Sequence, residues 1–288
     1  MIKNVGLILN TRKKQPIVLG RELLQWFSEK GIGVYTTEED GTELGVTPDR
    51  ISNNLGELVD CVVTLGGDGT LLRAARVTSP YVVPILGINL GVLGFLTEVE
   101  IPEIYDALER LIEGEYYFDD RMMLDGKIKR SGVISTSFEG LNDIVVKGPL
   151  ARLIIIDIFV NDQYVTTYNA DGVIISSPTG STAYSLSAGG PIVHPEVEVI
   201  IITPICPHTL HARPLVIPSQ KTVRIVIVKA HVDSMMTIDG QFGYQVEKGD
   251  EIIVGRSSKQ TRLIRIKHNS FFDILQEKLK TEGRISYE

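Results

Sequence analysis

Cysteine is scarce in this sequence of 288 residues, which contains only Cys61 and Cys206. The two cysteines stand far apart, so they do not suggest the disulfide framework that small secreted domains use. Long hydrophobic runs are also missing, because no apolar stretch approaches the roughly 18 residues that a transmembrane helix needs. Residues 1–10 lack the basic-then-apolar order of a signal peptide. We therefore expect a cytoplasmic protein with no membrane partner.

An excess of basic residues is missing as well. The chain has 36 acidic and 29 basic residues and a net charge of −7, whereas a dedicated nucleic-acid binder normally presents a basic face. We therefore expect no nucleic-acid partner, although one local basic patch is present at Arg12, Lys13 and Lys14. Apolar residues make up an ordinary 43% of the sequence, which is enough for large cores without a structural metal or disulfides.

Strand-like and helix-like segments alternate over the first part of the chain. Short apolar runs predict strands, and apolar residues at helical spacing between them predict helices. The expected strands cover residues 5–9, 33–36, 60–65 and 84–88, and the expected helices cover residues 16–30 and 102–113 and begin near residues 47 and 70. This alternation predicts an α/β domain built on a parallel sheet.

Strand-like runs dominate from about residue 121 onward, and they predict a β-rich second domain. These runs cover residues 152–160, 164–168, 172–176, 197–203, 222–228, 252–255 and 262–266. Residues 270–280 have the apolar spacing of an amphipathic helix. The chain is therefore expected to form two domains of different architecture.

The first candidate for chemistry is the segment Gly-Gly-Asp-Gly-Thr at residues 66–70. It follows an expected parallel strand and opens an expected helix, which is where open α/β sheets bind ligands. The backbone N–H groups of Gly66, Gly67 and Gly69 can approach a phosphate, and the helix start favours its negative charge. Asp68 would repel a phosphate, so it indicates a base near a reacting hydroxyl or a magnesium contact. A plain turn with Asp68 as helix N-cap is the alternative.

Two common nucleotide-binding signatures are absent. The sequence has no G-x-x-x-x-G-K-[ST] segment, which excludes a Walker-type phosphate loop. It also has no G-x-G-x-x-G segment, because Gly87, Gly91 and Gly94 have a different spacing. A standard Rossmann dinucleotide site is therefore not supported.

Two further segments carry polar groups that could recognise a ligand. Five of the eight residues at 177–184 bear a hydroxyl group, and such a segment can wrap around a ribose or a base edge, although composition alone favours a serine-rich surface loop. Asn142 and Asp143 offer donors and acceptors to vicinal hydroxyls, but they also fit an Asx-turn before a strand.

Cys206, His208 and His211 are ligand types that zinc prefers, at close spacing. We reject a zinc site, because a structural site takes four ligands and no second pair accompanies these three. The remaining histidines are isolated, and we interpret them as surface or hydrogen-bonded side chains: His194, His231 and His268.

Taken together, these motifs resemble those of the NAD kinase family, whose members phosphorylate NAD to NADP. The resemblance rests on five ordered segments, since the glycine-aspartate loop alone also occurs in lipid kinases and phosphofructokinases. The matching segments are residues 66–70, 87–96, 141–143, 171–191 and 207–215. One departure is Ser177-Pro178, where the family usually has Thr-Pro; the hydroxyl is kept.

The resemblance implies a fold, a reaction and a set of ligands. It implies an α/β domain at residues 1–120, a β-rich NAD-binding domain at residues 121–267, and a helical tail at residues 268–288 that returns to the first domain. It implies transfer of the γ-phosphate of ATP, or of polyphosphate, to the adenosine 2′-hydroxyl of NAD, with Mg²⁺ held by the phosphates rather than by a dedicated protein site. It also implies a homodimer or homotetramer whose subunits complete one another's NAD sites.

The resemblance further assigns roles to individual residues. Asp68 would be the catalytic base that activates the 2′-hydroxyl, while Gly66, Gly67 and Gly69 would hold phosphate. The residues that would contact NAD are Gly69, Phe95, Asn142, Asp143, Asp171, Thr179, Thr182, Ala183, Tyr184, Ser187, Asp239 and Gly240.

Two other functions fit part of the sequence. A lipid or sugar kinase could use the same glycine loop, but it would not need residues 177–184. A non-catalytic sensor of NAD or another nucleotide could be built on the same scaffold, but it would not need Asp68.

Overall fold

The computed structural model describes residues 2–79, 81–91, 94–149, 152–209, 211–267 and 270–282. The chain divides into two compact units: unit 1 comprises Met1–Asp120 and Thr261–Glu288, and unit 2 comprises Arg121–Gln260. It passes from one unit to the other inside two strands, β6 (Tyr117–Arg130) and β17 (Glu251–Arg265). The domain boundaries expected from the sequence, after residues 120 and 267, remain a prediction.

Unit 1 is built on a parallel sheet, as the alternating pattern predicts. Its central strands lie in the order β2-β1-β3-β4, and the short strand β5 (Val99–Glu100) and the last part of β17 each pair with β4. The bounds are Asn4–Leu9 for β1, Gly33–Tyr35 for β2, Cys61–Gly66 for β3 and Ile85–Asn89 for β4. Every residue of β3 and β4 is buried, which is the burial expected of parallel strands covered on both faces.

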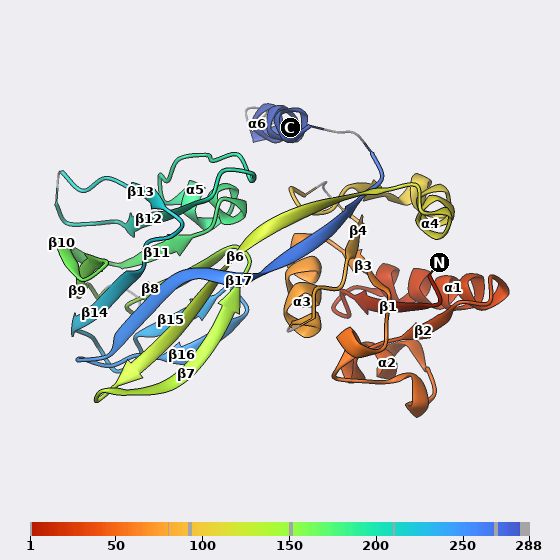
Figure 1. Cartoon of the computed structure of the whole chain (residues 1–288), viewed down its shortest axis with the longest axis horizontal. Helices are drawn as coiled ribbons and strands as arrows, with labels where there is room; N and C mark the ends of the chain where they lie inside the picture. The colour runs from red at the N-terminus through yellow and green to blue at the C-terminus, as the bar shows by residue number, and fades with distance from the viewer. Residues whose placement is uncertain are drawn as a thin grey trace, which may run out of the picture. The chain divides into compact units, whose positions relative to one another are not determined.

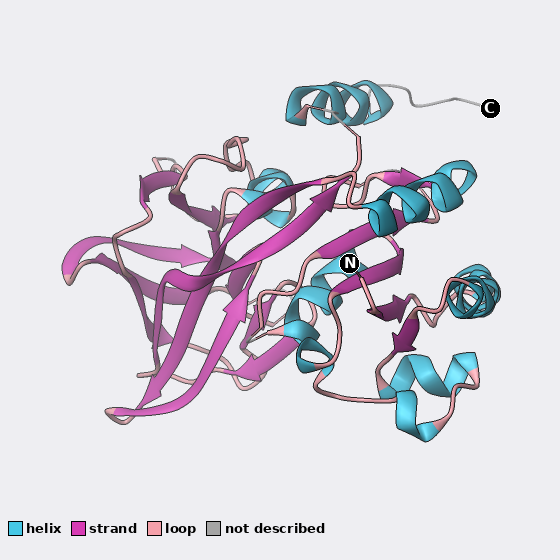
Figure 2. Cartoon of the chain, turned by 45° about the vertical axis from the view of Figure 1, so that its right-hand side comes forward, coloured by secondary structure: helices cyan, strands magenta, loops and turns pink. Residues whose placement is uncertain are grey.

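Helices accompany the strands of unit 1 (Figure 2). They are α1 (Lys14–Glu29), α2 (Glu38–Leu44), α3 (Asp68–Thr78) and α4 (Ile104–Glu113), and the C-terminal helix α6 (Phe271–Glu282) belongs to the same unit. Phe27 of α1 and Leu108 of α4 join one buried cluster with the strands. None of the described helices is long and apolar enough to cross a membrane.

Unit 2 consists of antiparallel strands in two sheets (Figure 1). One sheet has the order β10-β9-β14-β17, with the hairpin β6–β7 joined to β17, and the other has the order β13-β12-β11-β8-β15-β16. In the first sheet the bounds are Val133–Gly140 for β7, Ile154–Val160 for β9, Gln163–Ala170 for β10 and Val223–Lys229 for β14. In the second they are Asp143–Lys147 for β8, Gly172–Ser176 for β11, Val199–Ile205 for β12, Leu215–Pro218 for β13, Met235–Ile238 for β15 and Phe242–Gln245 for β16. Residues from both sheets form one buried apolar cluster.

The expected fold class is confirmed, because a parallel α/β unit precedes a β-rich unit and the described chain ends in a helix. Two local expectations are wrong. Residues 252–255 and 262–266 belong to one strand, β17, because this strand pairs with β6 as well as β14 and so incorporates the polar residues between the two apolar runs. The helix expected near residue 47 is only a 3-10 turn, Pro48–Arg50, whose preceding Thr47 side chain makes no capping bond.

Candidate active site

The segment Gly-Gly-Asp-Gly-Thr joins the carboxyl end of β3 to the start of α3. Strand β3 ends at Gly66, Gly67 is the N-cap of α3, and Asp68 is its first residue. Gly66 has no room for a side chain, because a Cβ there would collide with Thr70. At Gly67 and Gly69, in contrast, no described atom beyond the adjacent residues and the backbone of the helix itself lies within 4 Å of where a Cβ would stand. A side chain at either position would therefore stand clear of the rest of the chain, at the start of a helix, a position that favours an anion.

The Asp68 carboxylate is held by a second glycine-rich segment. Its Oδ2 accepts a hydrogen bond from the N–H of Phe95 at 2.9 Å, and its Oδ1 accepts from the N–H groups of Leu96 at 3.1 Å and Thr97 at 3.2 Å. The Thr97 hydroxyl also donates to Oδ1, at 3.2 Å. A Cβ on Gly94 would collide with this carboxylate. The N-cap interpretation of Asp68 is therefore wrong: its carboxylate is held in place by a distant loop, and Oδ2 is the less engaged oxygen.

In unit 2, Asp239 organises the segment that precedes β8. Its Oδ1 accepts from the N–H groups of Asn142 at 2.7 Å and Asp143 at 3.1 Å, and its Oδ2 accepts from Leu141 N–H at 2.9 Å. The N–H of Asp239 in turn donates to the Asp143 carbonyl at 3.0 Å. Asp239 and Gly240 both have left-handed backbones, with φ of 51° and 64°, as the hairpin between β15 and β16 requires. The expected residues 142–143 and 239–240 are thus brought together.

Ser177, which follows β11, lies against the same segment. Its N–H donates to the Asn142 carbonyl at 2.9 Å, and its hydroxyl donates to the Leu141 carbonyl at 2.5 Å. Its Oγ also accepts the N–H of Gly180 at 3.1 Å, and a Cβ on Gly180 would collide with the Asn142 backbone. Ser177 and Gly180 are buried. The interpretation of this segment as a surface loop is therefore wrong, because its first residues pack into the unit.

Two buried polar atoms of this cluster have no hydrogen-bond partner within the described part of the chain. They are Oδ1 of Asn142 and Oγ1 of Thr179, which begins the 3-10 turn Thr179–Thr182. Leaving a buried polar atom unpaired costs about 1–3 kcal/mol. The Asn142 side-chain oxygen does not close an Asx-turn, and hydroxyl or amide groups of a ligand would satisfy both atoms.

Asp143 is buried beside another carboxylate. Burial, and secondly the negative charge of Asp239, raise the pKa of Asp143 to about 7. Its carboxyl therefore changes charge near neutral pH, donating a hydrogen bond when protonated and accepting when ionised. A carboxyl perturbed in this way, beside unpartnered polar atoms, marks a functional-site candidate.

The remaining residues of the hydroxyl-rich segment are more accessible. Thr182 and Ala183 are half-buried, and the short helix Tyr184–Ser187 exposes both of its terminal residues. Phe95 belongs to unit 1, where its ring lies 6.2 Å from that of Phe271 in α6. The described structure therefore brings together only part of the expected NAD-contacting set within one unit.

Asp171 is separated from the Asn142 segment by the length of a strand. It precedes β11 (Gly172–Ser176), and Ser177 follows that strand. At about 3.3 Å per residue, Asp171 lies roughly 20 Å from Ser177 and Asn142. Within one chain, Asp171 is therefore not part of the cluster.

Within the ranges described, no group of three or more His, Cys, Asp or Glu side chains is placed to hold a metal ion. Both cysteines are free thiols, Cys61 buried and Cys206 exposed. The His231 ring lies 3.2 Å from the Leu153 carbonyl oxygen. Parts of the expected motifs lie outside the described residues: Val92, Leu93, Leu210 and His268.

Two domain models together match most of this chain. Residues 5–116 match the ATP-NAD kinase N-terminal domain, and residues 141–266 match the ATP-NAD kinase C-terminal domain. The chain belongs to the ATP-NAD kinase family. The resemblance carried by the sequence motifs is thereby confirmed.

Relatives of this ATP-NAD kinase family member align over nearly their whole length. An NAD kinase of Heliobacterium modesticaldum is 45% identical over 281 residues, covering 97% of this chain and 99% of the relative. An NAD kinase of Caldanaerobacter subterraneus is 44% identical over 280 residues, covering 96% and 99%.

Two solved structures share the fold. Yeast NADH kinase complexed with NADH has a TM-score of 0.84 and 29% identity, covering 100% of this chain and 89% of that one. An NAD kinase from Archaeoglobus fulgidus in complex with ATP has a TM-score of 0.76 and 24% identity, covering 96% and 99%. The similarity to the Archaeoglobus fulgidus structure shows a shared fold and nothing more.

Proposed function

We propose that this chain is an NAD kinase, which transfers the γ-phosphate of ATP, or of polyphosphate, to the adenosine 2′-hydroxyl of NAD. The family and the relatives named NAD kinase support this reaction. In the chain itself, the observation that carries the proposal is Asp68. Its carboxylate is fixed by four hydrogen bonds inside a glycine loop that opens a helix at the carboxyl end of a parallel strand.

Asp68 is assigned the role of general base. A ribose hydroxyl is a poor nucleophile at neutral pH, and a positioned carboxylate that takes its proton typically contributes about 10²–10⁴-fold to the rate. The bonds from residues 95–97 hold the carboxylate in one orientation, so little reorganisation is needed when the hydroxyl arrives. We assign the backbone of Gly66, Gly67 and Gly69 to the phosphate groups.

Magnesium fits this loop as a partner of the phosphates. Mg²⁺ keeps several waters and binds through one or two carboxylates plus substrate phosphates, and Asp68 supplies one such carboxylate. No cluster of three protein ligands is present among the described residues, so the phosphates and water would fill most of its coordination shell. When bound, the ion would neutralise charge on the transferred phosphoryl group.

Unit 2 is assigned the recognition of NAD. The unpartnered Asn142 Oδ1 and Thr179 Oγ1 would bond with the adenosine ribose, and Asp143 would add a donor or an acceptor according to its charge. We assign the adenosine pocket to these residues together with Thr182, Ala183, Tyr184, Asp239 and Gly240. A lipid or a simple sugar would not need this set of groups.

Asp171 and Ser187 are assigned to the nicotinamide end of the ligand. Because Asp171 stands a strand length away from Asn142, we propose that it serves the site of a neighbouring copy in a homodimer or homotetramer. The two free cysteines fit a reducing compartment, and we propose a cytoplasmic location.

The test is formation of NADP by the purified chain incubated with ATP, Mg²⁺ and NAD, followed with an NADP-specific dehydrogenase. We expect NADP only when all three are present. ADP release with a diacylglycerol or a sugar, and not with NAD, would favour a lipid or sugar kinase. Binding of NAD with no NADP formed would favour a sensor.

A further inference from the structure

The turn after β1 lies beside the glycine loop. Strands β1 and β3 are parallel, with Leu9 opposite Leu65. The N–H of Asn10 donates to the Leu65 carbonyl at 2.9 Å, and a Cβ on Gly66 would lie 3.2 Å from that of Asn10. Residues 10–14 and residues 66–70 therefore leave the same edge of the sheet side by side.

This turn concentrates positive charge on an acidic chain. Arg12, Lys13 and Lys14 are all exposed, and no ion pair joins any of them to another described residue. Helix α1 begins at Lys14 and has no acidic residue in its first turn, so the partial positive charge of its start adds to theirs. On a chain of net charge −7, such a group favours an anionic ligand.

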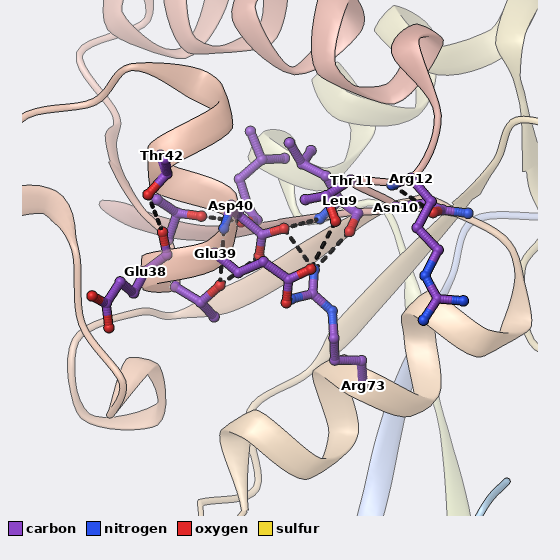
Figure 3. Close-up of polar contacts among 12 residues, drawn as sticks. Leu9, Asn10, Thr11, Arg12, Glu38, Glu39, Asp40, Thr42 and Arg73 are labelled. Carbon is purple, nitrogen blue, oxygen red and sulfur yellow. Dashed lines mark hydrogen bonds and ion pairs between the residues drawn. The ribbon is translucent and has the colours of Figure 1, made fainter. Parts of the chain in front are cut away.

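The helix that follows the glycine loop offers no cation in their place. Arg73 of α3 is already engaged: its Nη2 donates to the Asp40 carboxylate and to the Leu9 carbonyl, each at 2.6 Å, and its Nη1 lies 3.2 Å from Glu39 (Figure 3). Arg76 stands eight residues beyond the first residue of α3, about 12 Å along the helix axis. Positive charge for a phosphate chain must therefore come from another element.

Hydrogen bonds fix the backbone of the turn at residues 10–14. Arg73 donates to the carbonyl of Leu9, the residue before the turn, and the Thr11 hydroxyl donates to Glu39 at 2.7 Å. Asn10 closes the turn, since its Oδ1 accepts the N–H of Arg12 at 3.2 Å and its carbonyl accepts the N–H of Lys13 at 3.3 Å. Figure 3 shows the Arg12 side chain separate from the network around Arg73. A fixed backbone with uncommitted cationic side chains lowers the ordering cost of binding.

We propose that Arg12, Lys13 and Lys14 bind the phosphate chain of ATP and supply the positive charge that the glycine loop lacks. The inference rests on the proposed NAD kinase function. A triphosphate beside Asp68 meets a negative charge, and this chain has no lysine like the one with which Walker-type loops bind the phosphates. A guanidinium can hold phosphate oxygens with two parallel hydrogen bonds, whereas the lysines act as point charges.

The experiment compares Arg12→Gln, Lys13→Gln, Lys14→Gln and the triple variant with Lys3→Gln. Lys3 is exposed near the opposite end of β1, so its substitution changes the net charge without touching the turn. KM for ATP and KM for NAD are measured at low and high salt, and thermal stabilisation by Mg-ATP is measured without NAD.

We expect the triple variant to raise KM for ATP roughly 10–100-fold or more. The salt dependence of KM for ATP should be mostly lost in this variant, and KM for NAD should stay nearly unchanged. Lys3→Gln should behave as the wild type.

Two results would overturn the inference while the wild type makes NADP. In one, the triple variant keeps the wild-type KM for ATP. In the other, KM for NAD rises instead, which would assign the turn to the pyrophosphate of NAD. If the wild type makes no NADP, the proposed function fails. In that case, stabilisation of the wild type by Mg-ATP that the triple variant loses would still support the phosphate assignment. Equal stabilisation of the wild type and the triple variant would overturn it.

Discussion

Asp143 carries a proton that the folded chain holds more tightly than the unfolded chain. Its pKa is raised from 3.8 to about 7 by burial and by the charge of Asp239. A carboxyl with a raised folded pKa opposes folding in its ionised form, so the contribution of Asp143 to the free energy of unfolding is most favourable below about pH 4 and falls as the pH rises toward 7. Between these two pH values the free energy of unfolding changes by on the order of 4 kcal/mol through this group.

Asp143→Asn should therefore remove a pH-dependent loss of stability. We expect urea denaturation to show the wild type losing stability relative to the variant between pH 5 and pH 8. Asp233→Asn is the matched control, because Asp233 is an exposed acid of the same unit. Wild type and Asp143→Asn curves that run parallel over this range would show that Asp143 is already ionised at low pH.

Asn142→Ala separates ligand binding from a structural role. The Asn142 side-chain oxygen has no partner among the described residues, so its removal should cost little stability. The proposed bonds to ribose are shared by the ground state and the transition state, so KM for NAD should rise more than kcat falls.

Asn161→Ala provides the contrast. The Asn161 Oδ1 accepts the N–H of Thr222 at 2.9 Å and its backbone φ is 49°, so this variant should lose stability and keep its KM for NAD. If Asn142→Ala instead lost stability and kept the wild-type KM, Asn142 would be a turn residue.

At the scale of elements, one buried ion pair joins β1, α2 and α3. Asp40 of α2 is fully buried; its Oδ1 accepts from the N–H of Leu9 at 3.1 Å and from Arg73 at 2.6 Å. Its Oδ2 accepts the Thr37 hydroxyl at 2.7 Å. Without the guanidinium, a buried carboxylate would lose its counter-charge.

Arg73→Met should cost about 3–5 kcal/mol of unfolding free energy in urea titration, because it leaves Asp40 charged and unpaired. Adding Asp40→Asn should recover part of the loss, since the buried charge is then gone. Arg21→Met serves as control, since Arg21 makes an exposed bond to the Glu43 carbonyl. A loss below about 1 kcal/mol for Arg73→Met, typical of a surface pair, would contradict a stabilising role for this network.

Elements with a strong local pattern are predictable from the sequence, and the others depend on distant contacts. Strand β3 is a continuous apolar run with glycines at its end. Helix α2, which the sequence does not predict, is almost entirely polar, and its buried Asp40 is stabilised by β1 and α3. The hairpin β6–β7 is not predicted, because charged residues interrupt the apolar pattern of β6. Its turn, Ser131-Gly132, has φ of 50° and 84° and is a turn signal that the sequence does carry.

The candidate site divides in the same way. The glycine loop is predictable because its conformation depends on adjacent residues. The hydrogen bonds from residues 95–97 to the Asp68 carboxylate are not predictable, because they join residues 27–29 positions apart in the sequence. The burial of Ser177 cannot be predicted from composition either, since its hydroxyl donates to the Leu141 carbonyl, 36 positions away in the sequence.

At the scale of the whole molecule, the placement of Asp171 predicts an oligomer. If Asp171 serves a neighbouring copy, the active species contains at least two chains, and light scattering at assay concentrations should show a dimer or a tetramer. Asp171→Asn should then weaken NAD binding without dissociating the assembly. A stable, fully active monomer would rule out sites shared between subunits.

The chemical step is assigned to unit 1 and NAD recognition to unit 2, and the variant Asp68→Asn separates these two roles. Asparagine keeps an oxygen for the three bonds to Oδ1 but places an NH₂ group against the Phe95 N–H, which should cost about 1–2 kcal/mol of stability. Thr97→Val is the matched control, because it removes one bond to Asp68 and keeps the carboxylate.

The deciding measurement is the turnover of Asp68→Asn together with its dissociation constant for NAD by calorimetry. We expect kcat to fall roughly 10²–10⁴-fold, or about 3–5 kcal/mol of barrier, while the NAD dissociation constant stays close to that of the wild type. Thr97→Val should lose a similar amount of stability and keep most of its turnover. An Asp68→Asn variant that retains most of its turnover would contradict the assignment of Asp68 as the base.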